Sequence, residues 1–173
     1  MKKAMTVDVS SILKELGGKL EVCGEVTLPD TEFLGEYRFY EPLKVEGNIS
    51  NNGKALRLNA RVTGQMTTNC ARCTKEITVP VDFEMAENLM QGEGEAIVDE
   101  DVILFKDTAI ELDDIVLDNF LMNLEGKYLC SEDCKGLCPT CGADLNKGEC
   151  GCSKENIDPR WSQLLDIMKN NEN

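Results

Sequence analysis

The sequence predicts an α+β protein, in which an antiparallel β-sheet or an open barrel-like meander carries flanking helices and a small C-terminal cysteine-rich zinc module. Three observations predict this fold. Residues in the middle of the chain alternate between apolar and polar, which is typical of a half-buried strand. Apolar residues on either side of that stretch have helical spacing. Six of the nine cysteines lie between Cys130 and Cys152.

The first element that we expect is a short amphipathic helix near the N-terminus. Four apolar residues between Val9 and Leu16 have helical spacing, and Gly17-Gly18 is expected to end the helix. The segment from Glu21 to Tyr40 reads as extended or irregular.

Residues 56 to 69 form the strand that the sequence predicts most clearly. Their even positions are mostly apolar and their odd positions polar, so one face is expected to be buried. Asn52-Gly53, just before this strand, supplies the two positive-φ residues that a tight hairpin loop prefers. The expected pairs are Ile49 with Leu56, Val45 with Ala60, and Leu43 with Val62.

A second hairpin is expected to bury the same face of the central strand. Residues 76 to 85 alternate in the same way, and we place the bend at Ala71-Arg72. Pro80 lacks an amide donor, which indicates an outer strand or a bulge. The expected pairs are Met66 with Ile77, Val62 with Val81, Ala60 with Phe83, and Leu58 with Met85.

The later elements are a short strand and two helices. The apolar run 102–105 is expected to form a strand, and residues 112–124 have the spacing of an amphipathic helix with acidic residues near its start. We therefore expect a mainly antiparallel β domain over 1–126, a zinc-binding knuckle module over 127–157 and a C-terminal helix over 158–170 that packs back on it.

The cysteines indicate metal binding in the cytoplasm. From the residues that begin the sequence we expect no secretory signal, and a reducing compartment disfavours structural disulfides. The chain contains no histidine, so a metal site must use thiolates, or thiolates with a carboxylate. Free buried thiols and a reducible disulfide are the other interpretations. Both are disfavoured, because the cysteine-rich segment is polar and the cytosol is reducing.

The predicted zinc ligands come from the tail. Cys138 and Cys141 are three positions apart, as in many zinc sites, and Gly142 permits the left-handed turn that aims amides at sulfur. The second pair that we favour is Cys130 with Cys134, and Cys150 with Cys152 is the alternative. About one zinc ion per chain is expected.

Another pair, Cys70 and Cys73, lies at the bend of the long hairpin. Three interpretations remain open: a metal shared with a cysteine pair of the tail, a redox dithiol, or two small residues at a crowded corner. The redox interpretation is disfavoured, because no strand–helix context of thioredoxin type surrounds the pair.

Charge is segregated along this acidic chain, whose net charge is −14. Five basic and no acidic residues lie between Lys54 and Lys75, whereas thirteen acidic residues and one basic residue lie between Asp82 and Asp118. A basic sheet face could bind RNA, and the acidic part could bind a basic protein. The opposing interpretation is self-neutralisation, since Arg61 is expected opposite Asp82. The candidate binding surface comprises Arg57, Arg61, Cys70, Arg72, Cys73 and Lys75.

The sequence shows no catalytic constellation. A nucleotide-binding loop, a catalytic pair of carboxylates and a nucleophile with a partner base are not found, and no apolar run is long enough to span a membrane. We therefore expect a protein that is not an enzyme and has no small-molecule substrate or membrane partner.

Two cysteine motifs resemble those of a known family. The row C-A-R-C-T begins at Cys70, and C-S-E-D-C-K-G-L-C-P-T-C-G-A-D-L-N begins at Cys130, followed by Asp158-Pro159-Arg160-Trp161. These rows resemble the bacterial YceD family, described as large ribosomal RNA subunit accumulation proteins. The resemblance implies a role in synthesis, processing or stability of large-subunit ribosomal RNA. It also implies a tail stabilised by zinc, with the common function on the sheet and its hairpin.

Three hypotheses follow. The first is a ribosome-assembly factor that contacts ribosomal RNA through Arg57, Arg61, Arg72 and Lys75, or holds a basic ribosomal protein against its acidic side. The second is a zinc-ribbon interaction module in transcription or another assembly. The third is a thiol enzyme that uses Cys70 and Cys73, and it has the least support.

Overall fold

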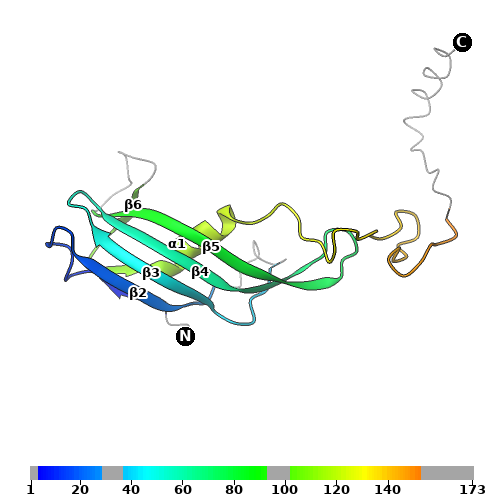
Figure 1. Ribbon diagram of the computed structural model, residues 1–173, viewed down its shortest axis with the longest axis horizontal. Coiled ribbons are helices and arrows are strands. Elements are labelled where there is room, and N and C mark those ends of the chain that lie inside the picture. Colours follow the sequence, from blue (N-terminus) through cyan, green and yellow to red (C-terminus); the bar gives the residue numbers. More distant parts are fainter. Residues whose placement is uncertain (1–3, 29–36, 93–101, 153–173) are drawn as a thin grey trace, which may run out of the picture.

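The computed structural model describes residues 4–28, 37–92 and 102–152, and over these ranges the chain is mostly β-sheet with one helix (Figure 1). The prediction of a β-rich, open architecture is confirmed, but the plural flanking helices are not: the described ranges contain only α1, Leu112–Met122. The C-terminal helix expected over 158–170 lies outside the described residues.

The main sheet has five strands in the order β2-β3-β4-β5-β6. Neighbouring strands are antiparallel except β5 and β6, which are parallel. A small second sheet pairs β1 (Thr6–Asp8) with β7 (Ala109–Glu111). The strands of the main sheet are β2 (Lys19–Val26), β3 (Leu43–Asn51), β4 (Leu56–Asn69), β5 (Glu76–Gln91) and β6 (Val102–Phe105).

The first hairpin is confirmed, but its predicted register is wrong by two residues. Ile49 lies opposite Leu58, and Val45 lies opposite Val62. The connection is a four-residue loop and not a tight two-residue turn. The side-chain oxygen of Asn52 accepts hydrogen bonds from the amides of Lys54 and Ala55, which stabilises this longer loop. A shift of two residues keeps each side chain on its predicted face of the strand.

The second hairpin differs from its prediction in the same way. Thr68 lies opposite Ile77, and the loop runs from Cys70 to Lys75 in place of a two-residue bend. Arg61 therefore lies opposite Glu84 and not opposite Asp82. Strand β5 pairs with β6 only from Asn88 onward, so Pro80 lies where the strand has no second neighbour among the described residues. Of the two expectations for Pro80, an outer strand or a bulge, the pairing matches the outer strand.

The expected N-terminal helix is wrong, because residues 9–16 form turns and bends between β1 and β2. The amides of Ile12 and Glu15 donate to carbonyls three residues earlier, which forms turns, and the side chain of Asn51 donates hydrogen bonds to the carbonyls of Ile12 and Leu13. Ile12 is buried, whereas Leu16 is 77% exposed and does not contribute to the core.

Helix α1 covers one face of the main sheet, as Figure 1 shows. Its apolar side, which includes Leu112, Val116 and Phe120, is buried with the inward residues of the strands. Phe120 also makes edge-to-face ring contacts with Tyr37 and Phe39. The helix was predicted over 112–124, so only its end differs. No helix among the described residues is long and apolar enough to cross a membrane.

Candidate metal centres

Eight of the nine cysteines gather into two groups of four. Within each group the four sulfur atoms lie within 4.8 Å of one another. The ninth, Cys23, is exposed on β2. We call the groups the hairpin cluster, formed by Cys70, Cys73, Cys130 and Cys134, and the tail cluster, formed by Cys138, Cys141, Cys150 and Cys152.

The structure does not bring the four expected zinc ligands together. Cys130 and Cys134 lie with Cys70 and Cys73, whereas Cys138 and Cys141 lie with the pair that was the alternative in the sequence, Cys150 and Cys152. The physical reason is that backbone hydrogen bonds attach the segment before Cys138 to the tip of the long hairpin. Of the interpretations open for Cys70 and Cys73, the geometry matches a site shared with a cysteine pair of the tail.

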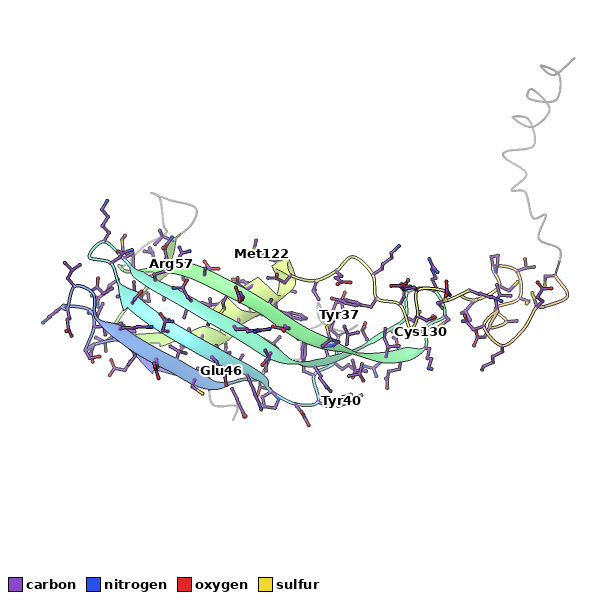
Figure 2. All side chains as sticks on the ribbon, viewed as in Figure 1. Tyr37, Tyr40, Glu46, Arg57, Met122 and Cys130 are labelled. Carbon is purple, nitrogen blue, oxygen red and sulfur yellow. The ribbon has the colours of Figure 1, made fainter. Side chains whose placement is uncertain are left out.

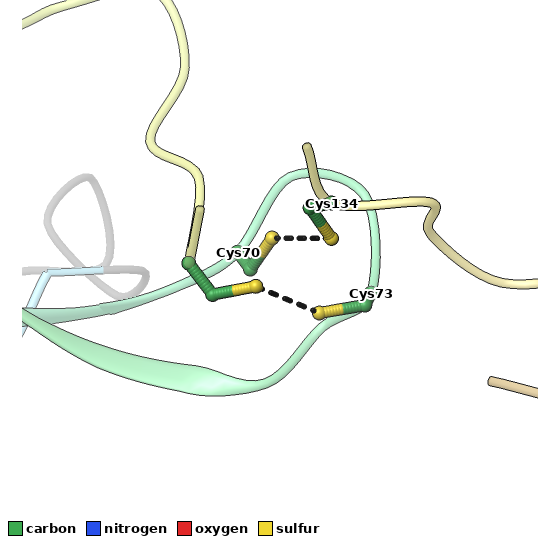
Figure 3. A group of neighbouring side chains, drawn as sticks. Cys70, Cys73 and Cys134 are labelled. Atoms are coloured by element: carbon green, nitrogen blue, oxygen red, sulfur yellow. Dashed lines mark hydrogen bonds between the residues drawn. The ribbon is translucent and has the colours of Figure 1, made fainter. Parts of the chain in front are cut away.

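The sulfur spacing in the hairpin cluster fits a tetrahedral metal. The sulfur of Cys70 lies 3.8 Å from that of Cys134, and the sulfur of Cys73 lies 3.6 Å from that of Cys130 (Figure 3). A regular tetrahedron with metal–sulfur bonds of about 2.3 Å has sulfur atoms roughly 3.8 Å apart. A disulfide would require a sulfur–sulfur distance of about 2.05 Å. The four sulfurs are therefore close enough together that one metal ion could contact all of them.

The loop of the hairpin is shaped around these sulfurs. The amide of Cys70 donates to the Lys75 carbonyl, and the amide of Thr74 donates to the Cys70 carbonyl. Thr74 has φ of +56°, a left-handed conformation that β-branched residues rarely adopt. The loop from Cys70 to Lys75 thus forms a knuckle that carries both Cys70 and Cys73. The predicted two-residue turn would not form this knuckle.

The tail is attached to this knuckle through few contacts. The amide of Ala71 donates to the Tyr128 carbonyl at 2.9 Å, and the amide of Leu137 donates to the Arg72 carbonyl at 3.1 Å. The guanidinium of Arg72 donates to the carbonyl of Cys134 at 2.7 Å. Arg72 is therefore engaged in holding the tail.

The tail cluster is built from local turns. The amide of Gly142 donates to the Cys138 carbonyl, and the amide of Cys138 donates to the Ala143 carbonyl. Gly142 has φ of +72°, as predicted for the residue after the second cysteine of the motif. Gly148 also has positive φ, at +152°, on the way to Cys150. All four ligands thus lie within one short stretch of chain.

Backbone amides favour a thiolate at one cysteine of each cluster. Burial raises the pKa of Cys70, but amides of the hairpin loop and of Cys130 donate to its sulfur and together lower the pKa to about 6. In the tail cluster, the amides of Cys141 and Thr140 lower the pKa of Cys138 to about 6. Each cluster therefore contains a ligand that readily loses its proton.

Neighbouring thiols oppose further ionisation. The thiols of Cys134 and Cys73 raise the pKa of Cys130 to about 12, and the thiol of Cys141 raises the pKa of Cys152 to about 12. A divalent cation at the centre of each group would remove this penalty, because it favours the deprotonated form of every ligand.

The candidate binding surface does not form one patch. Arg57 donates to the side chain of Asn88, and Arg61 makes two hydrogen bonds with Asp82, at 2.7 and 2.6 Å. Figure 2 places Arg57 and Cys130 toward opposite ends of the molecule. Lys75 is exposed on the hairpin loop, whereas Arg57 and Arg61 lie in the first half of β4, far from that loop along the strand.

The outward face of the main sheet carries alternating charges. One row across the strands runs from Cys23 through Glu46 and Arg61 to Glu84, so Arg61 has acidic neighbours on both sides. None of the outward residues of the described strands β2 to β5 is aromatic. Such a face lacks the stacking platforms with which sheets commonly bind single-stranded RNA.

Comparison with known proteins gives one family and several distant relatives. A family model described as "Large ribosomal RNA subunit accumulation protein YceD" matches residues 58–168. An uncharacterized protein of Mycobacterium tuberculosis is 25% identical over 95% of this chain and 81% of its own. The uncharacterized protein YlbN of Bacillus subtilis is 24% identical over 82% of this chain and 83% of its own.

A plant relative carries a more informative name. The "Large ribosomal RNA subunit accumulation protein YCED homolog 1, chloroplastic" of Arabidopsis thaliana is 24% identical, over 80% of this chain and 52% of its own. No solved structure matches the chain.

Proposed function

Because the chain belongs to the YceD family of large ribosomal RNA subunit accumulation proteins, we propose that it is a non-enzymatic factor supporting the synthesis, processing or stability of large-subunit ribosomal RNA. The family match over more than half of the chain carries this proposal. The name of the Arabidopsis relative supports the same role. The proposal places the protein in the bacterial cytoplasm, where thiols stay reduced and ribosomes are assembled.

Zinc is the metal that we propose for the cysteine clusters. Every ligand is a thiol, and four soft thiolates in a tetrahedral arrangement are typical of zinc in a structural site. Four protein ligands leave no open position for a water molecule or substrate, which favours a structural role over catalysis. The absence of histidine from the chain also removes the commonest general base.

A basic ribosomal protein is the contact that we favour over ribosomal RNA. The net charge of −14 opposes a phosphate backbone, and the two arginines of β4 already have hydrogen-bond partners on β5. The outward side of α1 offers the opposite charge, since Asp114 and Asp118 are exposed one turn apart and Glu111 precedes them. Electrostatic complementarity would then guide the partner to this helix.

The test is co-sedimentation of the tagged chain with large-subunit precursors, with the bound RNA and proteins identified. We expect Asp114→Lys combined with Asp118→Lys to lose co-sedimentation and to lower the level of large-subunit ribosomal RNA. Glu21→Lys with Glu25→Lys changes the charge equally on the exposed face of β2 and is expected to behave as wild type. If the variant with Arg57→Glu and Arg61→Glu loses binding while the variant with Asp114→Lys and Asp118→Lys retains it, the contact is with RNA instead.

The other two hypotheses predict different outcomes. A zinc-ribbon module in transcription or another assembly would be captured with a non-ribosomal complex, and ribosomal effects would be indirect. A thiol enzyme would lose all function on Cys73→Ser even when the variant retains its fold. If the chain binds no ribosomal component and complementation is unaffected by every variant, the proposed function is wrong.

A further inference from the structure

We propose that this chain binds two metal ions with different structural tasks: an ion in the hairpin cluster fastens the tail to the sheet, and an ion in the tail cluster stabilises only its own loop. This inference rests on the proposal that the clusters hold zinc, and it goes beyond the single tail ion that the sequence predicts.

The eight ligands separate completely into two sites. Cys134 and Cys138 are four residues apart, yet their sulfurs belong to different groups. Each group has four sulfurs within 4.8 Å of one another, which is a full tetrahedral set, so neither needs a ligand from the other. A single ion per chain would leave four thiols gathered without a charge at their centre.

The two sites close loops of very different length. In the hairpin cluster, Cys70 meets Cys134 across 64 residues, and Cys73 meets Cys130 across 57 residues. All ligands of the tail cluster lie between Cys138 and Cys152. An ion in the hairpin cluster therefore fixes a contact between distant parts of the chain, whereas an ion in the tail cluster closes a local loop.

Apart from a metal, the contacts that hold the tail against the hairpin tip are few. Among the described residues they include the backbone hydrogen bonds of Ala71 and Leu137, the hydrogen bonds donated by the Arg72 guanidinium, and the amide of Cys130 that faces the sulfur of Cys70. The buried cysteines of the cluster are packed against partly buried Leu129 and Leu137, apart from the main core. Such a junction is too small to be stable by apolar burial alone.

The two sites also differ in access to solvent. In the hairpin cluster Cys70, Cys73 and Cys134 are buried and only Cys130 is exposed, whereas in the tail cluster only Cys138 is buried. A chelator or thiol reagent should therefore reach the tail cluster first. Metal release is expected to show two phases, with the slow phase from the hairpin cluster.

The experiment uses the full chain, reduced and reconstituted with zinc. Native mass spectrometry is expected to show two zinc ions per chain, and a colorimetric chelator should release them in two phases of equal amplitude. Cys141→Ser should remove the fast phase and leave the Leu137 amide protected from hydrogen exchange, because that amide bonds to the Arg72 carbonyl at the hairpin tip. Cys73→Ser should remove the slow phase and that protection together.

Two further variants keep the test decisive. Cys130→Ser alters the hairpin cluster from the tail side, so it reports on the same site if Cys73→Ser disturbs the sheet. Cys23→Ser lies outside both clusters and should retain both ions and both phases. One ion in the wild type, or two ions in both Cys73→Ser and Cys130→Ser, would overturn the proposal. Two ions without any ribosomal binding would leave it standing and reject the proposed function instead.

Discussion

Gly136 lies at the point where the tail turns against the hairpin tip. Its backbone has φ of +76°, and a Cβ at this position would lie 3.0 Å from the Arg72 carbonyl oxygen and 3.3 Å from the Arg72 Cβ. The same carbonyl accepts the Leu137 amide. A side chain larger than hydrogen would therefore push apart the two segments that the hairpin cluster joins.

We predict that Gly136→Ala loosens the hairpin cluster. Left-handed backbone costs an L-residue about 1 kcal/mol, and the contact with Arg72 adds to it, so metal release from this cluster should accelerate at least about fivefold. Gly142→Ala is a matched control, because Gly142 has φ of +72° but a Cβ there would have nothing within 4 Å. It should accelerate release from the tail cluster only. Equal effects of both variants on the slow phase would contradict this assignment.

The thiol of Cys70 predicts a pH dependence of the metal-free protein. Its pKa in the folded chain is about 6, below the 9.0 of an ordinary thiol, so the unfolded state binds more protons between these values. The stabilisation is complete above pH 9, declines as the pH falls, and is absent below pH 6. The loss of unfolding free energy caused by Cys70→Ser should therefore be larger at about pH 8.5 than at about pH 6. Urea unfolding in the presence of chelator measures it, and a pH-independent difference would disprove the prediction.

The sequence identified the cysteines but not their grouping. The motif around Cys138 and Cys141 indicated a metal site, and nothing in the spacing alone decides whether Cys130 and Cys134 or Cys150 and Cys152 complete it. The decision comes from tertiary contacts, such as the hydrogen bond from Ala71 to the Tyr128 carbonyl. The number of cysteines could have indicated two sites, because the eight cysteines other than Cys23 make two complete sets of four ligands.

At the scale of elements, the hairpin faces were predictable and the registers were not. Alternation fixes which side chains point inward, so Val45, Leu58 and Val62 are buried as expected. Loop length fixes the register, and neither loop is the two-residue turn that was predicted. The Asn52 side chain bonds to the amides of the first loop, and the amide of Cys70 donates to the Lys75 carbonyl across the second. Strand β6, expected as a strand, pairs in parallel because its partner is set by the fold and not by the adjacent sequence.

Strands β3 and β4 approach closely at Gly47. A Cβ on Gly47 would clash with the Asn59 carbonyl oxygen and lie 2.5 Å from the Ala60 Cα, both of which are backbone atoms of β4. We predict that Gly47→Ala lowers the free energy of unfolding by about 2 to 3 kcal/mol, as expected for overpacking. Urea unfolding measures the loss.

Gly24→Ala provides the control for this prediction. A Cβ there would meet the terminal Cε of Met5 at 2.6 Å, and a flexible side-chain end can move aside. We expect Gly24→Ala to cost less than about 1 kcal/mol. If the two variants are equally stable, the approach of β3 to β4 is not the constraint that the structure indicates.

At the scale of the whole molecule, two separate regions of buried side chains exist within the described ranges. The main core joins the strands, α1 and the N-terminal turns, and it contains no cysteine. The hairpin cluster forms a second, small region beyond the end of that core. Metal ions are therefore not needed to bury the apolar residues of the sheet. Tyr128 still packs against the main core, whereas the described tail after it, residues 129 to 152, has only the hairpin cluster as a buried region.

Because the two buried regions are separate, we predict that metal removal releases the tail but leaves the stability of the sheet almost unchanged. With a strong chelator under reducing conditions, far-ultraviolet circular dichroism should retain the β-sheet signal, and the main urea transition should shift by less than about 1 kcal/mol, because the core burial is unchanged. Proteolysis should instead become fast in the tail, as its attachment to the hairpin is lost. Chelator saturated with zinc beforehand is the control. Collapse of the sheet signal on chelation would show that the clusters support the whole fold, since the sheet would then depend on ions that touch it only at the tip of one hairpin.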